Sequence, residues 1–421
     1  IVGGGPAGLS AAYQLARRGF RVSIYESQAQ LGGLLRYGIP SYRLDKSILD
    51  AEIARIVNLG VTVHLNTSIA DKGGLEALRA EHDAVFLATG ATKSKVLPGL
   101  DYSQPWVRDG AKFLAQTNAG EACDLGRHLV VIGGGSAGID VARTARRLGR
   151  DVTVLALEPD DLLPAQRTEV VEAREEGIRF VCGAMMQKVD AGADGLTINC
   201  VEVAFTPGAA RGQFTIAPVD GSAFTLAADA IIPSIGQDAD LKKYGDLLAS
   251  AGPVIAHDEN WQTSSPGIFA GGDLTSMDRF VTEAIGMGKE AAIAIARFVD
   301  PEQPALARQS DPAVPFKVIN TAYHSTDGRE SPAHVAVEQR LKSFGEVQQR
   351  FTKAAAEIEA KRCFSCGTCI YCDNCYFYCP DMAITKLDQG YEVKLDYCKG
   401  CGLCVAECPT GAINMAEDLG R

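Results

Sequence analysis

The chain has 421 residues, enough for about three domains. Apolar residues make up 46% and charged residues 22%, the mixture of a folded globular protein. The net charge of −11 comes without any basic run, which argues against nucleic-acid binding and against an anionic membrane surface. No apolar stretch approaches the roughly 20 residues that span a bilayer, so we expect no membrane span.

In chain order, short β-branched runs alternate with amphipathic helical stretches as far as about residue 300, the pattern of an α/β protein. The predicted strands are 22–25, 84–88, 128–132, 152–155 and 230–233. The predicted helices are 9–18, 139–148 and 282–298, and 335–361 is expected to be mostly helical. Only Ile1 and Val2 precede the first glycine motif, whereas strands run about five residues, so we expect residues upstream of Ile1.

The first glycine motif has the spacing G-x-G-x-x-G directly before a predicted helix. Its residues are Gly3, Gly5, Pro6, Ala7 and Gly8. Such glycines permit a tight turn and close approach of a pyrophosphate, and the helix N-terminus offers N–H groups to it. Glu26 ends the next strand at about the 20-residue spacing at which a carboxylate binds ribose hydroxyls. The motif therefore predicts a dinucleotide site.

A second copy of this motif begins 130 residues further on. Its residues are Gly133, Gly135, Ser136, Ala137 and Gly138. Glu158 again ends the following strand at the spacing of a ribose-binding acid. Two motifs imply two dinucleotides, a flavin and a nicotinamide, because hydride exchange requires both.

Four further motifs carry a resemblance to a known family: GGLLRYGIP at 32–40, ATG at 88–90, IPSIGQ at 232–237 and SPGIFAGGD at 265–273. They resemble the small subunit of bacterial glutamate synthase and related NAD(P)H-dependent flavoproteins with two nested Rossmann domains. The resemblance implies that Gly33 and Leu34 border the isoalloxazine of FAD and that Asp273 hydrogen-bonds its ribityl chain. It also implies that a helix starting at Thr282 points at the flavin pyrimidine ring. Further cofactor-binding residues implied by these motifs are Thr89, Gly90, Gly236, Gly272 and Ala284.

Ten of the thirteen cysteines lie between Cys363 and Cys408, a dense block in a long chain that indicates a metal-binding module in a reducing compartment, the cytoplasm. Two C-x2-C-x2-C-x3-C-P runs follow one another, as in bacterial ferredoxins with two [4Fe-4S] clusters, where the fourth cysteine of each run ligates the other cluster. A pair of zinc sites, the alternative, favours C-x2-C pairs with longer gaps. The first cluster is assigned to Cys369, Cys372, Cys375 and Cys408, and the second to Cys398, Cys401, Cys404 and Cys379.

Cys363 and Cys366 continue the C-x2-C spacing upstream of Cys369. They are additional to the eight ligands that two clusters need. We expect them to be unligated, because the x3-C-P ending sets the register. The alternatives are a register shifted to include them with Cys369, a third metal site, or a role as buried thiols.

The predicted fold class is α/β, with two nested Rossmann-type dinucleotide-binding domains and a small C-terminal two-cluster ferredoxin domain. We place the FAD-binding domain at 1–100 and 255–300, the NAD-binding domain at 101–254, a linker and helices at 301–360, and the ferredoxin domain at 361–421.

The predicted function is that of an oxidoreductase subunit that passes electrons between two [4Fe-4S] clusters and NAD(H) through FAD, with no catalytic side chain, because hydride transfer needs none. NAD(H) is expected rather than NADP(H), because Leu157 and Glu158 stand where NADP-using relatives carry two arginines, although Arg167 lies near enough in sequence to reach a phosphate.

The flavoprotein–ferredoxin fusion resembles the FAD electron-transfer subunit of anaerobic 2-oxoacid dehydrogenases, such as phenylglyoxylate dehydrogenase. This implies partner subunits that hold thiamine diphosphate, since this chain lacks a thiamine-diphosphate motif. The alternatives are an NAD(P)H:ferredoxin oxidoreductase that supplies low-potential electrons to a ferredoxin, a glutamate synthase-like small subunit, and a non-catalytic subunit that wires a larger complex.

Overall fold

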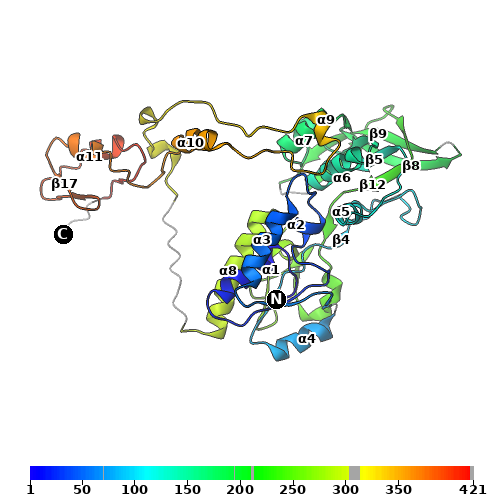
Figure 1. The fold of residues 1–421 in the computed structure, drawn as a ribbon, viewed down its shortest axis with the longest axis horizontal. Coiled ribbons are helices and arrows are strands. Elements are labelled where there is room, and N and C mark those ends of the chain that lie inside the picture. Colours follow the sequence, from blue (N-terminus) through cyan, green and yellow to red (C-terminus); the bar gives the residue numbers. More distant parts are fainter. Residues whose placement is uncertain (70, 194, 210–212, 303–312, 418–421) are drawn as a thin grey trace. The chain divides into compact units, whose positions relative to one another are not determined.

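The computed structural model describes residues 1–69, 71–193, 195–209, 213–302 and 313–417. The chain divides into two compact units (Figure 1). The first unit is Ile1–Ala305 with Val335–Val347, and the second is Leu306–His334 with Gln348–Arg421. The chain therefore passes between the units three times.

One half of the first unit is built on a small parallel sheet. Val2 bridges β1 and β3, so the strand order is β2, β1, Val2, β3 and β16. The strands are β1 (Ser23–Tyr25), β2 (Thr62–His64), β3 (Val85–Leu87) and β16 (Ile268–Ala270). Helix α1 (Pro6–Ala16) packs along α8 (Val281–Val299), as Figure 1 shows, and both share a buried core with α3 (Lys46–Val57).

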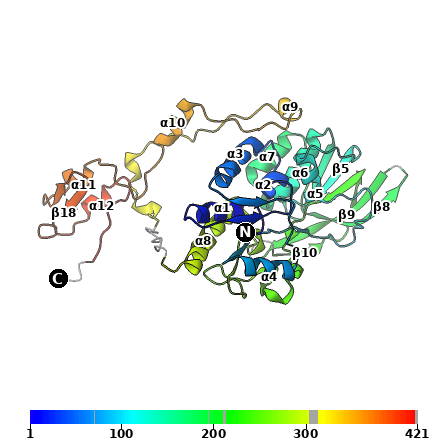
Figure 2. The same cartoon turned by 60° about the horizontal axis from the view of Figure 1, so that its bottom comes forward.

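The other half holds the second parallel sheet, with the order β12, β5, β6 and β7. The strands are β5 (His128–Ile132), β6 (Asp151–Leu155), β7 (Arg179–Val181) and β12 (Ala230–Pro233). All four residues of β12 are buried, as expected for a strand covered on both faces. The helices are α5 (Gly110–Asn118), α6 (Ser136–Arg147) and α7 (Arg167–Glu175), and an antiparallel sheet adds β8 (Ala184–Gly192), β9 (Gly195–Pro207), β10 (Phe214–Pro218) and β11 (Phe224–Ala228) (Figure 2).

Short elements complete the first unit. They are α2 (Leu34–Tyr37), α4 (Lys72–Glu81), α9 (Val337–Arg340), β4 (Lys93–Ser94), β13 (Gln237–Asp238), β14 (Ser250–Ala251), β15 (Val254–Ile255), and the 3₁₀ helices Asp160–Leu162, Leu241–Leu247 and Gly272–Leu274.

In its described residues, the second unit consists of short elements. They are α10 (Lys353–Lys361), α11 (Asn374–Phe377), α12 (Leu403–Ala406), the antiparallel hairpin of β17 (Ile384–Lys386) and β18 (Tyr391–Val393), and the 3₁₀ helices Phe316–Val318 and Thr321–Tyr323. In the described ranges, no helix combines the length and the apolar character required to cross a membrane.

Each predicted strand and helix of the first 300 residues has a counterpart in the structure, with bounds that differ by a few residues at most. Helix α1 begins at Pro6, three residues earlier than expected, because proline is well suited to the first helical turn. The expectation of a mostly helical 335–361 is wrong. Only α9 and α10 are helical there, because the intervening chain bonds other backbone: Val347 N–H donates to Tyr42 O at 2.9 Å, and Val347 is buried.

Candidate functional site

The first glycine motif forms an open cradle at the start of α1. Gly5 is the N-cap and no side chain caps the helix, so its first N–H groups face outward without a side-chain acceptor. A Cβ atom at Gly5 would have no neighbour closer than Gly33 Cα at 3.9 Å, whereas one at Gly8 would lie 2.0 Å from Gly3 O. Gly8 therefore permits the close helix–turn contact, and Gly5 leaves room for a phosphate.

Glu26 lies at the edge of this cradle and is buried. Its carboxylate accepts hydrogen bonds from Gly4 N–H at 2.7 Å and from Gln28 N–H at 2.8 Å. On the other side, a Cβ at Gly3 would meet Ala88 O at 2.4 Å, which places the loop with Thr89 and Gly90 directly beside the motif. The structure thus brings together the glycines, the predicted ribose-binding acid and the 88–90 motif.

The second glycine motif repeats these contacts at the start of α6. Gly135 is an uncapped N-cap with open space around its Cβ position, and a Cβ at Gly138 would lie 2.1 Å from Gly133 O. A Cβ at Gly133 would meet Ser234 O at 2.4 Å, which places the loop with Gly236 where the first site has residues 88–90. Ser136 and Ala137 form the first turn of α6. The two halves are structural copies.

The acid of the second site occupies the same place as that of the first. A Cβ at Gly134 would lie 3.5 Å from Glu158 Oε2, and one at Gly4 would lie 3.2 Å from Glu26 Oε2. Burial raises the pKa of Glu158 above its ordinary value. The carboxylate therefore faces a partly desolvated position where a hydrogen-bond donor such as a ribose hydroxyl would stabilise it.

The residues implied to contact the flavin gather around the first cradle. A Cβ at Gly33, which has φ +52°, would lie 2.8 Å from Gly5 Cα, so Leu34 follows directly beside the glycine turn. A Cβ at Gly272 would meet the Ala7 side chain at 2.9 Å, which places Asp273 at the same site. Thr282 and Ala284 lie in the uncapped first turn of α8.

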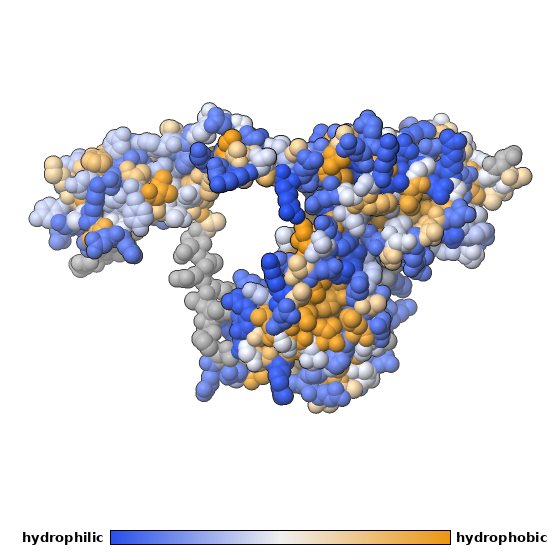
Figure 3. Space-filling view, viewed as in Figure 1, coloured by the Kyte–Doolittle hydropathy of each residue, from blue (hydrophilic) through white to orange (hydrophobic). Residues whose placement is uncertain are grey.

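Asp273 and the surface around the cradle fit a bound group. Burial raises the pKa of Asp273, partly offset by Arg279, and the carboxylate accepts no hydrogen bond from any residue that the structure describes. Leu34 and Ile285 are exposed apolar side chains. Figure 3 shows a hydrophobic area on the first unit beside the point that Figure 1 marks as the N-terminus. The residues present thus fit a flavin dinucleotide.

In the second unit, the two cysteine runs share one backbone conformation at a spacing of 29 residues. Tyr371, Asp373 and Met382 of the first run have φ values of +58°, +65° and +51°. The equivalent residues of the second run are Gly400, Gly402 and Gly411, with φ values of +70°, +76° and +66°. Positive φ is uncommon and costly for residues other than glycine, so the same loop shape is imposed on both runs.

The last cysteine of each run receives a matching backbone hydrogen bond. Ala383 N–H donates to Cys379 Sγ at 3.2 Å, and Ala412 N–H donates to Cys408 Sγ at 3.3 Å. Burial opposes ionisation of Cys408, but the N–H groups of residues 410–412 and the Thr410 hydroxyl outweigh it and hold the pKa of this thiol below its usual value. These contacts favour the thiolate, the form that binds metal.

Side-chain contacts tie each run to the other. Asn374, in α11, donates to Glu407 O at 3.1 Å, next to Cys408. Lys399, next to Cys398, pairs with Asp381 at 3.0 Å, two residues after Cys379. The fourth cysteine of each run therefore lies beside the opposite run, as cross-ligation of two clusters requires.

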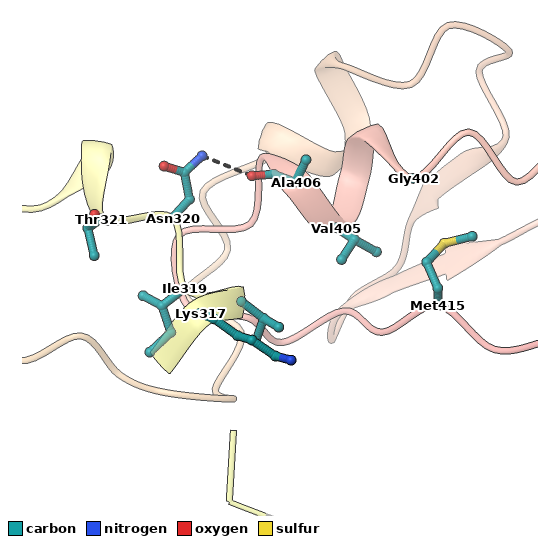
Figure 4. Close-up of a pocket in the computed structure, with 9 residues that line it drawn as sticks. Lys317, Ile319, Asn320, Thr321, Gly402, Val405, Ala406 and Met415 are labelled. Atoms are coloured by element: carbon teal, nitrogen blue, oxygen red, sulfur yellow. Dashed lines mark hydrogen bonds between the residues drawn. The ribbon is translucent and has the colours of Figure 1, made fainter. Parts of the chain in front are cut away.

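A hollow of about 500 Å³ lies beside the second run (Figure 4). Asn320 donates to Ala406 O at 2.9 Å and fastens the 316–323 segment to α12, which carries Cys404. Among the described residues, no three or more His, Cys, Asp or Glu side chains are close enough together to hold a single metal ion. A [4Fe-4S] cluster instead spreads its four thiolates around a cube of iron and sulfur.

Comparison with known proteins identifies the family. Residues 1–293 match the model of the pyridine nucleotide-disulphide oxidoreductases, and residues 368–412 match that of the 4Fe-4S dicluster domain. The chain belongs to the pyridine nucleotide-disulphide oxidoreductase family and carries a 4Fe-4S domain after it. These matches confirm the predicted fold class and the predicted class of oxidoreductase.

Several curated relatives are similar to this chain. It is 34% identical to the NADP(+)-dependent formate dehydrogenase subunit beta of Moorella thermoacetica, over 87% of this chain and 54% of that protein. It is 36% identical to the NAD-dependent dihydropyrimidine dehydrogenase subunit PreT of Escherichia coli, over 71% of this chain and 68% of PreT. The chain thus spans about half the length of the formate dehydrogenase subunit.

Two solved structures share the fold at low sequence identity. Mycobacterium tuberculosis FprA in complex with NADPH matches with a TM-score of 0.59 and 14% identity, over 71% of this chain and 84% of FprA. The thioredoxin reductase of Lactococcus lactis matches with a TM-score of 0.51 and 23% identity, over 71% of this chain and 97% of the reductase.

A buried polar network that no sequence motif predicts joins the two halves of the first unit. Tyr42 lies under the guanidinium groups of Arg143 and Arg147, and Arg43 donates to Asp140 at 2.7 Å. The network links the segment after Leu34 to α6, which starts with the second glycine motif. The signal in the sequence, several arginines within one helix, is normally that of a solvated face.

Proposed function

We propose that this chain is the FAD-dependent subunit of a cytoplasmic multi-subunit oxidoreductase and passes electrons between NAD(H) and two [4Fe-4S] clusters. One observation carries the proposal. The same chain holds two dinucleotide cradles of matching geometry and two cysteine runs that are joined to each other by side-chain contacts. When bound, a flavin can take up a hydride as two electrons and release them singly to clusters.

The chain's own residues would bind and orient these groups. The uncapped N-termini of α1 and α6 would hold the two pyrophosphates, and Glu26 and Glu158 the ribose hydroxyls. Gly33, Leu34 and Asp273 would position the flavin. The cysteines would hold the first cluster with Cys369, Cys372, Cys375 and Cys408, and the second with Cys398, Cys401, Cys404 and Cys379.

NAD(H) is the proposed nicotinamide. Glu158 stands where Glu26 stands in the first cradle, and that position in a flavin dinucleotide site meets a ribose without a 2′-phosphate. A carboxylate there accepts hydrogen bonds from hydroxyls and repels a phosphate.

For the complex as a whole we propose an NAD-dependent 2-oxoacid dehydrogenase of the phenylglyoxylate type, with thiamine diphosphate on a partner chain. Relatives are named as subunits of formate and dihydropyrimidine dehydrogenases, which supports a partner chain without naming the substrate. Anaerobic co-purification and mass spectrometry test this: we expect a thiamine-diphosphate-binding subunit, and isolation of this chain with a formate- or pyrimidine-oxidising subunit would overturn the 2-oxoacid assignment.

Iron and flavin analysis tests the cofactor content. The anaerobically reconstituted chain is expected to contain about eight non-haem irons per FAD, the content of two cubane clusters. About four irons per FAD would contradict the two-cluster assignment, and zinc in place of iron would contradict the ferredoxin interpretation as a whole.

A further inference from the structure

The two surplus cysteines belong to a third loop with the conformation of the cluster-binding loops. In the stretch from Cys363 to Cys369, Ser365 has φ +50° and Gly367 has φ +74°. These residues hold the same places between their cysteines as Tyr371 and Asp373 in the first run and Gly400 and Gly402 in the second. Ser365 is not a glycine, so the conformation again costs free energy that a random loop would avoid.

The third loop also directs backbone N–H toward sulfur. Ser365 N–H donates to Cys363 Sγ at 3.4 Å from two residues along the chain, whereas Cys379 and Cys408 accept from N–H groups four residues along. Cys363 and Cys366 are exposed, so the alternative in which they are buried structural thiols is wrong. Exposed thiols in this conformation are free to bind a metal group.

The loop lies beside the fourth ligand assigned to the first cluster. Gly367 N–H donates to Thr410 O at 2.7 Å, two residues after Cys408. A cavity of about 370 Å³ is lined by Cys363 from the third loop, by Cys372 from the first run and by Pro409, which follows Cys408. Both loops therefore border the same space next to Cys408.

This geometry does not provide a separate third metal site. The third loop and the first run overlap at Cys369, so both loops cannot hold a full cluster at once.

We propose that Cys363 and Cys366 are reserve ligands of the first cluster. Together with Cys369 and Cys408 they form a second ligand set, alternative to Cys369, Cys372, Cys375 and Cys408. In the exchange, the Cys363 and Cys366 thiols each lose a proton and bind iron, while the Cys372 and Cys375 thiolates leave and take up those two protons. No electron is exchanged. The inference rests on the proposed cluster assignment.

The test compares matched variants in the two runs. Cys372→Ser removes a ligand from the run that has spare cysteines, and Cys401→Ser removes its equivalent 29 residues later, where none are spare. After anaerobic reconstitution we expect Cys372→Ser to keep about eight irons per FAD, with an altered electron paramagnetic resonance signal from one cluster. We expect Cys401→Ser and the triple variant Cys363→Ser/Cys366→Ser/Cys372→Ser to fall to about half.

Two outcomes would overturn the proposal. One is loss of iron in Cys372→Ser equal to that in Cys401→Ser. The other is retention of iron in the triple variant, because the replacement ligand would then lie elsewhere. FAD content monitors folding of the first unit in every variant. The iron content of the unaltered chain tests the two-cluster assignment itself, so failure of that assignment and failure of the reserve-ligand proposal give different results.

Discussion

Glu26 and Glu158 occupy equivalent places in the two cradles but differ in what their carboxylates contact. Both follow a parallel strand, and Glu26 lies beside Gly4 as Glu158 lies beside Gly134, yet only Glu26 accepts a hydrogen bond from the N–H of that glycine, at 2.7 Å. Glu158 makes no such contact in the described structure, and burial raises its pKa. Its carboxylate is therefore open to a hydrogen-bond donor such as a hydroxyl group.

Replacing Glu158 with arginine is expected to move nucleotide preference from NADH toward NADPH. A guanidinium in this position would bind the 2′-phosphate, and charge-assisted hydrogen bonds contribute about 1.5–3 kcal/mol each. The measurement is the ratio of kcat/KM for NADH over NADPH in dye reduction. Asp161→Arg, an equal charge change on an exposed residue of the same loop, is the control and is expected to leave the ratio near its original value. A chain that prefers NADPH before any substitution would contradict the assignment.

At the scale of elements, α6 is attached to the rest of the first unit by charges rather than by apolar contacts alone. Arg143 and Arg147 both donate to Glu176, at distances of 2.7–3.0 Å, and all three side chains are buried. The guanidinium groups hold the pKa of Glu176 below its usual value against the opposing effect of burial. Since Tyr42 packs on the same arginines, the network fixes the second cradle relative to the segment beside the flavin cradle.

Glu176→Gln is expected to destabilise the first unit by about 3–5 kcal/mol, because it leaves the buried Arg147 guanidinium without a charged partner among the described residues and Arg143 with Glu172 alone. Urea unfolding followed by flavin release measures this. Glu76→Gln breaks an exposed pair with Lys72 in the same unit and serves as the control, with an expected effect of about 0–1 kcal/mol. Equal effects of the two substitutions would show that the buried network does not stabilise the unit.

Asp140 gives this network a pH dependence. Burial, reinforced by Glu169, raises the pKa of Asp140 to about 7 despite its contact with Arg43. The folded state therefore keeps a proton that the unfolded chain has lost, and stability falls as pH rises from about 4 to about 7. Above that range the contribution is constant. The free energy of unfolding should thus be lower at about pH 8 than at about pH 5, and Asp140→Asn should reduce this difference. An unchanged difference in the variant would assign the pH dependence to other groups.

The sequence predicts those parts of the site that depend on local spacing. A short stretch of sequence is enough to recognise the glycine motifs, the acids about 20 residues later and the cysteine runs. In the structure, each acid lies beside its glycine motif, and the two cysteine runs contact each other. The contact between Tyr42 and Arg143 cannot be predicted in this way, because it buries two residues that lie about a hundred positions apart in the chain. The prediction of a mostly helical 335–361 is wrong for the same reason. Val347 N–H donates to the backbone of Tyr42 instead of continuing a helix, and no local sequence pattern indicates this distant contact.

At the scale of the whole molecule, the two units differ in what stabilises them. Among the described residues, every cluster of buried apolar side chains lies in the first unit. The second unit exposes large apolar side chains instead, with Phe377 73% and Met382 87% exposed, and its helices are short. A small unit without an extended apolar core generally needs a metal group to fold, because the free energy of metal binding then supplies the free energy of folding.

Removal of iron is therefore expected to act on the second unit alone. Oxidative chelation of the clusters should open this unit to proteolysis after residue 348, while the first unit keeps FAD and NADH still reduces it. Transfer of electrons onward to a one-electron protein acceptor should be lost. Limited proteolysis with mass spectrometry and anaerobic titration with NADH, each before and after chelation, measure the two effects.

Chelation that releases FAD along with iron would show that the units do not fold independently, and a protease-resistant second unit without iron would show that its fold does not depend on the clusters. Each result is read against the same protein with its clusters reconstituted, because only the return of protease resistance with iron ties the structural change to the clusters rather than to oxidation.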